Sequence, residues 1–527
     1  MLKNMPMCNL IFTALFSMTS LITSCAGDEN RELPVQFVRY EKDNSIQSNI
    51  LNSSVKYSIY LPEGYKENLE QTYSVVYLLH GYGDDNNSWN DESLDVTGVI
   101  MMLEKAGRIS PMIYVLPQGF NSYYVNRYTG RYNYMDMFIK ELVPHIDSVY
   151  RTKADREHRA VVGYSMGGFG AMVLPSLNPD VFSVSVPLSM SFRTDAQYMT
   201  EPADGWNNQW GNIFGGYGMQ GEARLTDYYK SHCPLHFFTK ENASYYSDVH
   251  YFLDCGDDEE QLSVGNDELH MLMREVGISH EYRVRDGAHT SSYWRSGMKE
   301  VLPFIESCFK GEAYIEEDTL TINTTFSGSF ERKTICGVEA SFFLPAGYDA
   351  KSASSYNVVY LAHDGLDLNN EKAIISILDE VQKSTPFIMV LFDHKKLVGK
   401  TFLDWAKNVE VTLSVEGGTG KRIGIGNTDG GRFLFEASCG STTIMKSLYL
   451  FDAAIDGLIM TPNVNTSYYI DITDMGKNYR GANALYLKCR ESGIDHEYRV
   501  RNGLDSTHSL LTGLRNIKTS LLKKLNN

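Results

Sequence analysis

Residues 160–171 read AVVGYSMGGFGA. The β-branched run at 160–162 predicts a short buried strand, and the small residues after Ser165 predict a helix. A serine between glycines at such a strand-to-helix turn is typical of an exposed nucleophile, although a plain glycine-rich turn is the simpler alternative. Glycine is favoured there because it lets neighbouring backbone segments approach closely. The stretch therefore predicts an α/β fold with Ser165 as the nucleophile.

Strands and helices alternate on both sides of this stretch. Residues 74–79 and 112–116 have the composition of buried strands, whereas 136–150 and 266–276 have the periodicity of amphipathic helices. Such alternation favours a mostly parallel sheet with helices on both faces.

Segments of the first half recur in the second half in the same order. Residues 55–65 match 338–348, residues 73–80 match 356–363, and residues 280–285 recur identically at 496–501. Three matches in one order predict a duplication, and hence two tandem α/β domains. We expect the first at 34–310, a linker and domain start at 311–335, and the second at 336–527.

The general base and the acid are expected after the nucleophile in the chain. His289 lies in a loop after a predicted strand, where an imidazole can reach the serine. The acid that orients the histidine is expected in an earlier acidic loop, with Asp258 as first choice, Glu259 as second and Asp257 as third. For most of these carboxylates a solvated turn or a calcium loop is the alternative.

Two further sets of residues complete the predicted site. The backbone N–H groups of Tyr82 and Met166 are expected to bind an oxyanion. Aromatic side chains that contact substrate are predicted at Trp89, Trp206, Trp210, Tyr217 and Trp294. The long segment between nucleophile and acid, which carries three of them, is equally typical of an aromatic packing insert.

The second copy lacks much of this chemistry. The aligned replacements are Ser165 by Thr428, Met166 by Asp429, His289 by Asp505 and Gly81 by Asp364. Asp474 alone retains an acid position. Because such residues act as a unit, we expect the second domain to be non-catalytic, either structural or carbohydrate-binding. A threonine nucleophile with His508 as its base is the alternative.

The overall charge and the N-terminal segment limit the kinds of partner that we expect. The formal net charge of −17 argues against nucleic acid and against adhesion to anionic lipid. Residues 10–21 form an apolar run too short to span a bilayer, and Leu-Ile-Thr-Ser-Cys at 21–25 resembles a bacterial lipobox. We expect a signal peptide at 1–24 and lipidation of Cys25, against a simple cleaved signal as the alternative. The expected location is the periplasm or the cell surface of a bacterium, with membrane contact only through this lipid.

Several motifs together resemble one branch of the α/β-hydrolases. They are 61–65, 80–83 with Trp89, 141–147 with 150–151, 163–168, and 287–289 with Trp294. The branch is the group of esterases that includes feruloyl and acetylxylan esterases of carbohydrate esterase family one and esterase D. One departure is Glu259, because the family commonly has aspartate three residues after the glycine that corresponds to Gly256.

The resemblance implies two tandem α/β-hydrolase-type domains, of which the first hydrolyses esters through an acyl-enzyme. Feruloyl or acetyl esters on a plant cell-wall polysaccharide such as xylan are the implied substrates, and no cofactor or metal is expected. An esterase for another ligand such as a siderophore, an acyltransferase, and a surface glycan-binding lipoprotein are the alternatives.

Overall fold

The computed structural model describes residues 39–259, 261–316, 321, 323–351, 356–397, 401–440, 442–457, 460–503 and 506–526. The predicted signal peptide and the predicted lipidation site Cys25 lie outside these residues, as does Asp505. Within the described residues, no helix has the length and apolar character needed to cross a membrane. The six cysteines of this part of the chain form no disulfide with one another.

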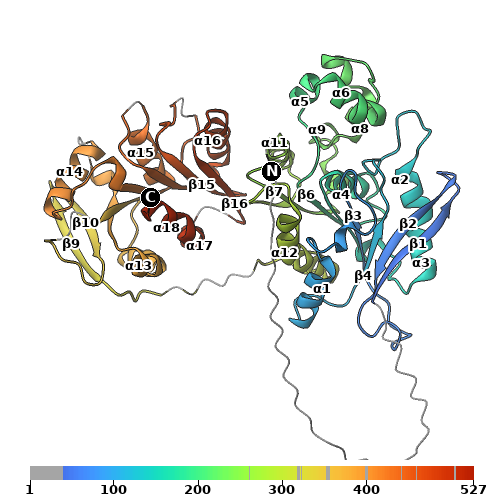
Figure 1. Ribbon diagram of the computed structural model, residues 1–527, viewed down its shortest axis with the longest axis horizontal. Helices are drawn as coiled ribbons and strands as arrows, with labels where there is room; N and C mark the ends of the chain where they lie inside the picture. Colours follow the sequence, from blue (N-terminus) through green and yellow to red (C-terminus); the bar gives the residue numbers. More distant parts are fainter. Residues whose placement is uncertain are drawn as a thin grey trace, which may run out of the picture. The chain divides into compact units, whose positions relative to one another are not determined.

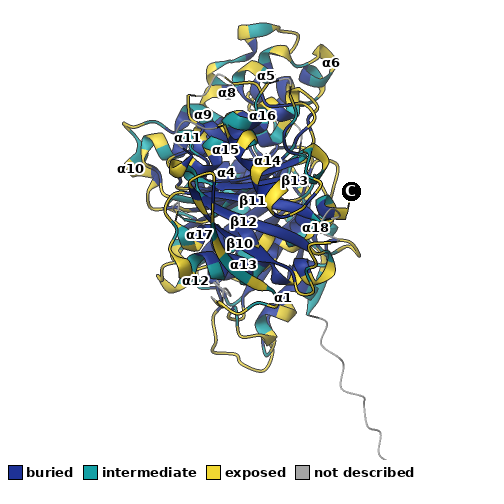
Figure 2. Ribbon diagram, turned by 90° about the vertical axis from the view of Figure 1, so that its left-hand side faces the viewer, coloured by how far each residue is buried: buried dark blue, intermediate teal, exposed yellow. Residues whose placement is uncertain are grey.

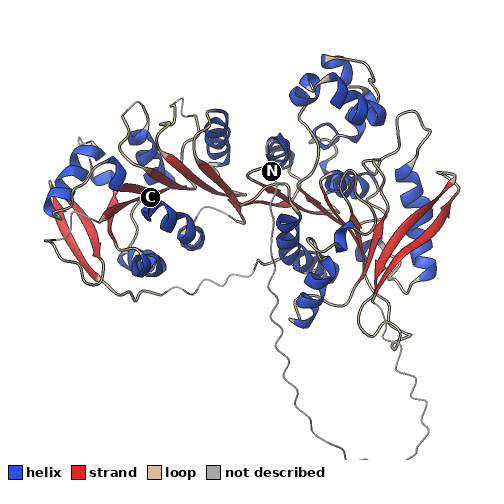
Figure 3. Ribbon diagram, in the orientation of Figure 1, coloured by secondary structure: helices blue, strands red, loops and turns tan. Residues whose placement is uncertain are grey.

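One sheet of 16 strands runs through the described chain (Figure 3). In the first half its strands are β1 (Tyr40–Ser48), β2 (Ser53–Tyr60), β3 (Val75–Leu79), β4 (Ile113–Pro117), β5 (Arg159–Tyr164), β6 (Val184–Leu188), β7 (His250–Gly256) and β8 (His280–Arg285). In the second half they are β9 (Ser329–Ile335), β10 (Val338–Leu344), β11 (Asn357–His363), β12 (Phe387–Asp393), β13 (Arg422–Asn427), β14 (Ser447–Phe451), β15 (Ser467–Thr473) and β16 (His496–Arg501).

Both halves of the sheet have the same strand order. The first half runs β1-β2-β4-β3-β5-β6-β7-β8, and the second, taken from its outer edge inward, runs β9-β10-β12-β11-β13-β14-β15-β16. The strands from β4 to β8 and from β12 to β16 are parallel, whereas the outer strands are antiparallel. The predicted α/β class with a mostly parallel sheet is therefore confirmed.

The sequence did not predict that the two halves share a sheet. Strand β8 pairs with β16 in antiparallel orientation, with Val284 opposite Val500, so the two halves share one continuous sheet. The physical reason is that each half ends its strand order on an edge with free N–H and C=O groups, and pairing the two edges satisfies them.

Helices cover both faces of the sheet (Figure 1). The longer ones in the first half are α1 (Val96–Lys105), α3 (Val143–Val149), α4 (Met166–Leu177), α11 (Gln261–Val276) and α12 (Ser291–Lys310). In the second half they are α13 (Leu368–Ser384), α14 (Phe402–Thr412), α15 (Thr428–Ser438), α16 (Tyr479–Glu491), α17 (Thr507–Asn516) and α18 (Lys518–Asn526). Apolar residues of α1 and α12 pack on one face of the first half, and those of α13, α17 and α18 on one face of the second. Every residue of the inner strands β3, β4, β5, β6, β11 and β14 is buried, as the dark strands of Figure 2 illustrate.

An insert of short helices separates β6 from β7. Its helices are α5 (Asp195–Thr200), α6 (Ala203–Gly205), α7 (Gly211–Phe214), α8 (Asp227–His232), α9 (Pro234–Phe237) and α10 (Ala243–Tyr246). The corresponding connection in the second half, from β14 to β15, spans only 452–466. The insert therefore belongs to the first half alone.

A buried polar cluster joins helices of the two halves. Asp267 on α11 is 2 % exposed and accepts hydrogen bonds from the hydroxyls of Tyr282 and Tyr479, both at 2.8 Å. The side-chain amide of Asn483 donates to its other oxygen at 2.9 Å. Burial raises the pKa of Asp267 to about 6, although these donors act in the opposite direction. Since Tyr479 and Asn483 lie on α16, each half contributes to satisfying this carboxylate.

Candidate active site

Ser165 lies in a strained turn between β5 and α4. Its backbone has φ 57° and ψ −119°, a conformation that is costly for a residue with a side chain. The Ser165 N–H donates to the carbonyl of Leu188 at 3.0 Å, and its own carbonyl accepts from Phe169 at 3.2 Å. These bonds hold the turn open at the carboxyl ends of the parallel strands, where α/β folds place their ligands.

Two glycines make this turn possible. A Cβ atom on Gly163 would lie 2.1 Å from the carbonyl oxygen of Gly167, and one on Gly167 would lie 2.1 Å from that of Leu79. Both distances are far below van der Waals contact. The Gly-x-Ser-x-Gly spacing thus reflects backbone segments of β3, β5 and α4 that touch each other.

A chain of hydrogen bonds links Ser165 to His289 and Glu259. The Ser165 Oγ lies 2.9 Å from Nε2 of His289, and Nδ1 of His289 lies 2.8 Å from Oε2 of Glu259. The Glu259 side chain is 0 % exposed, whereas that of His289 is 36 % exposed. A hydroxyl, an imidazole and a carboxylate in this order form the arrangement that activates a serine, because the acid fixes the tautomer of the base.

The second carboxylate oxygen of Glu259 is also satisfied. It accepts the Gly256 N–H at 3.0 Å and a very short hydrogen bond from the Ser189 hydroxyl. The indole N–H of Trp294 in turn donates to Ser189 at 2.8 Å. The acid is thus fixed by backbone and side-chain donors that do not compete with His289.

The first-choice acid, Asp258, is corrected by this geometry. The structure places Glu259 against His289, while the Asp258 side chain is exposed to solvent. Asp257, the third choice, pairs with Arg499 across the sheet. The physical reason is the turn after Gly256, which brings the third residue back toward the Gly256 N–H.

The two predicted oxyanion donors lie on adjacent segments. Met166 is the first residue of α4, so its N–H has no partner within the helix. The loop after β3 that carries Tyr82 contacts the same turn, because a Cβ on Gly167 would lie 2.8 Å from the His80 carbonyl. The Gly83 N–H in this loop is held by the Asn121 side chain at 2.8 Å.

His80 fixes the base of that loop. Its Nδ1 lies 2.8 Å from the Gly81 carbonyl, and its Nε2 accepts the Gly119 N–H at 2.8 Å. Burial lowers the pKa of His80, so the ring is neutral and one nitrogen donates while the other accepts. His80 is therefore a structural residue.

Four of the five predicted aromatic substrate contacts are packing residues instead. Trp89, Trp206 and Trp210 are at most 1 % exposed and Trp294 is 7 % exposed, whereas Tyr217 is 61 % exposed. Their rings contact protein: Trp89 packs edge-on against Tyr164, Trp206 donates to the Gly216 carbonyl, Trp210 lies against Tyr123 and Phe214, and Trp294 stacks on Tyr164 and meets His289 edge-on. The sequence missed two other exposed aromatics near these segments, Phe120 and Tyr128.

The second half repeats the turn but not its chemistry. Thr428 has φ 44°, and a Cβ on Gly430 would lie 2.3 Å from the Ala362 carbonyl, as Gly167 does from Leu79. Asp474 matches Asp257 rather than the acid, because its N–H bonds the Arg501 carbonyl as Asp257 bonds that of Arg285. Gly476 then stands at the position of Glu259. The sequence assignment of Asp474 to the acid position is therefore corrected.

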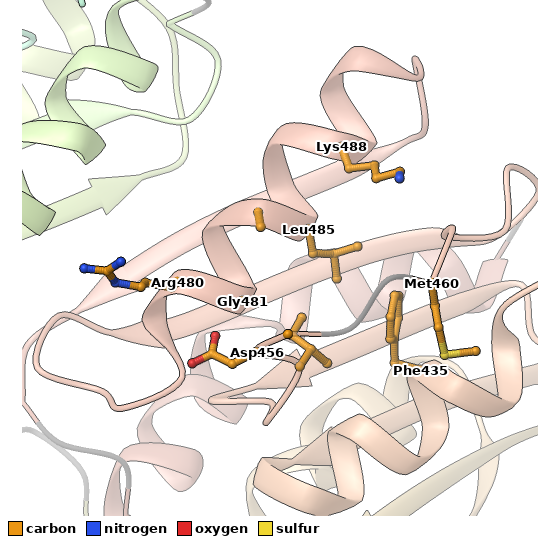
Figure 4. A pocket seen from close by; sticks show the side chains of 10 residues that line it. Phe435, Asp456, Met460, Arg480, Gly481, Leu485 and Lys488 are labelled. Carbon is orange, nitrogen blue, oxygen red and sulfur yellow. The ribbon is translucent and has the colours of Figure 1, made fainter.

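Two other features lie away from the triad. A cavity of about 460 Å³ is bounded by α15, α16 and the segment after β14. Figure 4 shows Leu485 projecting toward Phe435 and Met460, with the charged ends of Arg480 and Lys488 pointing outward.

One group of carboxylates has the spacing to hold a metal ion among the described residues: Asp257, Asp258 and Asp286. Arg499 offsets part of the negative charge of this group, since it pairs with Asp257 and lies 3.4 Å from Asp286.

Comparison with known proteins finds a family match in the first half of the chain. Residues 48–305 match the sequence profile of the family described as "Putative esterase".

Two curated relatives match parts of this segment. A protein of Xylanibacter ruminicola named "Endo-1,4-beta-xylanase/feruloyl esterase" is 31% identical over 177 residues, which cover 30% of this chain and 24% of the relative. "Esterase Rv1288" of Mycobacterium tuberculosis is 35% identical over 119 residues, or 22% of this chain and 24% of the relative. The chain thus spans about a quarter of the length of each. Among solved structures, a "ferulic acid esterase" aligns at 29% identity with a TM-score of 0.43, over 51% of this chain and 100% of that one.

The close approach at Gly167 leads to a stability prediction. Gly167→Ala should destabilise the chain by about 3 kcal/mol, because the new methyl group would clash with the Leu79 carbonyl. Gly420→Ala is the matched control, since nothing lies within 4 Å of its Cβ position. Thermal unfolding of both variants measures the difference, and equal midpoints would contradict the close contact.

Proposed function

We propose that the first half is a serine carboxylic-ester hydrolase that works through an acyl-enzyme. The carrying observation is the hydrogen-bonded series Ser165–His289–Glu259 at the carboxyl ends of the strands. The match of residues 48–305 to an esterase family supports the same reaction.

In this mechanism His289 acts as base and then as acid. It takes the proton of the Ser165 hydroxyl as the oxygen attacks the ester carbonyl, and Glu259 stabilises the imidazolium. The N–H groups of Met166 and Tyr82 donate hydrogen bonds to the carbonyl oxygen and stabilise the negative charge that develops on it. His289 then protonates the departing alcohol, and a water molecule activated by the same residue releases the acid.

The proposed substrates are feruloyl or acetyl esters of a plant cell-wall polysaccharide such as xylan. The name of the Xylanibacter ruminicola relative, which joins a xylanase with a feruloyl esterase, supports this choice. Tyr82, Tyr128 and Tyr217 are 47, 47 and 61 % exposed, so their rings are available to stack on an aryl group or a sugar. A siderophore esterase or an acyltransferase uses the same acyl-enzyme, and product analysis with competing alcohol acceptors separates these alternatives.

We also infer that the chain arose by duplication and is exported as a lipoprotein. The shared strand order, the recurring turn at Thr428 and the identical strands β8 and β16 support the duplication. The lipobox-like sequence before Cys25 supports export to the periplasm or the cell surface.

The hydrolytic function predicts a sharp dependence on one hydroxyl. Wild-type protein should hydrolyse at least one of methyl ferulate, p-nitrophenyl acetate and acetylated xylan, and Ser165→Ala should lower kcat by about 10⁴-fold or more. Release of ferulate, nitrophenol or acetate is measured, with circular dichroism to show that both proteins are folded. Folded wild-type protein that turns over none of the three would refute the proposal.

The assignment of the acid gives a second kinetic prediction. Glu259→Gln should lower kcat by about 100-fold or more, because the amide no longer fixes the His289 tautomer or stabilises its charged form. Asp258→Asn is the control, one residue away on the same loop, and should leave kcat unchanged. A larger loss in the Asp258 variant would restore the original choice of acid.

Saccharide binding by the second half is a second candidate function. A cavity of about 360 Å³ lies at the carboxyl ends of β11, β13 and β14, in the size range of small-molecule sites. Carboxylates, amides and hydroxyls line it: Asp364, Asp367, Asn370, Asn427, Thr428, Asp452, Ser506 and Thr507. The buried Oδ1 of Asn427 accepts no hydrogen bond from the described residues. An uncharged sugar fits this lining because its hydroxyls donate to such oxygens, whereas an anion would face three carboxylates.

This candidate predicts a binding site that one amide controls. Unesterified xylohexaose should bind the wild-type chain, and Asn427→Leu should abolish binding by removing the amide from the cavity wall. Lys488→Ala, at the separate cavity of Figure 4, is the control and should bind normally. Titration calorimetry measures both. Binding that survives Asn427→Leu but is lost in Tyr217→Ala would assign the sugar to the first half instead.

A further inference from the structure

Residues of the second half bind the loop of the first half that precedes Glu259, which is called the acid loop. One oxygen of the Asp257 carboxylate accepts the backbone N–H of Tyr498 at 3.1 Å and pairs with the guanidinium of Arg499. The carbonyl of Asp257 accepts the Tyr486 hydroxyl at 3.0 Å. Asp257 lies two residues before Glu259, so the second half holds the chain immediately before the proposed catalytic acid.

Asp257 also ties the acid loop to the histidine loop. Its other oxygen accepts the Gly287 N–H at 3.1 Å, and its own N–H donates to the Arg285 carbonyl at 3.2 Å. The next residue, Asp258, donates its N–H to the Gly287 carbonyl at 3.1 Å. Gly287 lies two residues before His289. The loops that present Glu259 and His289 are therefore bonded to each other through the residue that the second half holds.

Helix α16 fixes the other side of the same loop. The Tyr486 hydroxyl lies 2.9 Å from the hydroxyl of Ser263, to which Arg490 donates at 2.7 Å. Together with the bonds from Tyr479 and Asn483 to Asp267, these contacts follow one face of the helix, at intervals of three or four residues. The segment that contains Glu259 is thus anchored by α16 at position 257 and again at position 263.

We propose that the second half is a permanent scaffold for the active site of the first. Arg499 and Tyr486 are positioning residues that act through Asp257, and they hold Glu259 where it meets His289. The exact position of Glu259 matters for the rate, because a misplacement of about 1 Å in a catalytic group costs on the order of 100-fold in rate. The kinetic consequence rests on the proposed hydrolytic function, whereas the ordering of the loop does not.

The chain contains its own control for this proposal. Asp474 makes the corresponding contacts on the other side of the junction: its carboxylate pairs with Arg283 at 3.1 Å and accepts the Gly503 N–H at 2.8 Å. The loop that follows Asp474 has Gly476 where the first half has Glu259. Substitution of either aspartate removes an equivalent buried ion pair from the junction, but only one of them adjoins the triad.

The test compares Asp257→Asn with Asp474→Asn in the full chain. Asp257→Asn should lower kcat about tenfold or more with KM unchanged, because substrate binding is retained while the acid is displaced. Asp474→Asn should retain wild-type kcat. Tyr486→Phe, which keeps the packing and loses only the hydroxyl, should lower kcat in the same direction. Equal losses in the two aspartate variants, or wild-type kinetics in Asp257→Asn, would overturn the proposal.

Hydrogen–deuterium exchange provides a readout that needs no substrate. Amides in the segment 254–263 should exchange faster in Asp257→Asn and Tyr486→Phe than in wild type or Asp474→Asn. Unchanged exchange in both variants would overturn the proposal. If wild-type protein hydrolyses no ester, the proposed function fails, while this comparison still decides whether the second half orders the loop.

Discussion

The contact between Gly167 and the Leu79 carbonyl is the constraint on which the active site depends. It lets α4 start directly against β3, and this close start forces Ser165 into its positive-φ conformation. A residue held in such a conformation needs surroundings that over-determine it. Here the central strands supply them, since β3, β5 and β6 each provide backbone groups to the turn. Ser165 is therefore positioned by the neighbouring strands of the sheet as well as by the turn that contains it.

The same backbone constraint persists in the second half, where other side chains stand at the positions of Ser165 and Glu259. Thr428 is β-branched and nevertheless has a positive φ, which is a stronger strain than that at Ser165. Gly426 and Gly430 still permit the contact between helix and strand. Backbone geometry is thus kept by packing of the whole sheet, although Thr428 and Gly476 stand at the positions of Ser165 and Glu259. The turn is evidence of the fold, and only the side chains are evidence of the chemistry.

The sequence predicted the features that depend on local patterns. Residue spacing around Ser165 identified the turn, and the loop position of His289 identified its partner. Asp258 is the predicted acid, whereas Glu259 lies beside His289 in the structure. Four carboxylates follow one another in the sequence, and only the turn after Gly256 decides which one points back. The sequence also does not report which side chains are buried. Four tryptophans that the sequence predicts as substrate contacts are enclosed by neighbours that are distant in the chain: Trp89, Trp206, Trp210 and Trp294. The continuous sheet depends on one strand pair between distant segments, which no periodicity reports.

The junction also accounts for the presence of Glu259, and not Asp257, beside His289. The Asp257 carboxylate accepts hydrogen bonds from the N–H groups of Gly287, in the histidine loop, and of Tyr498, in the second half. It also pairs with Arg499 of the second half. These three donors hold the Asp257 carboxylate at the junction between the halves, and no hydrogen bond joins it to His289 among the described residues. Glu259 lies two residues farther on, within reach of the Gly256 N–H and of His289 with separate oxygens. Asp257 and Glu259 therefore have different roles. One joins the halves of the molecule, and the other is free to face the serine because the first holds the loop in place.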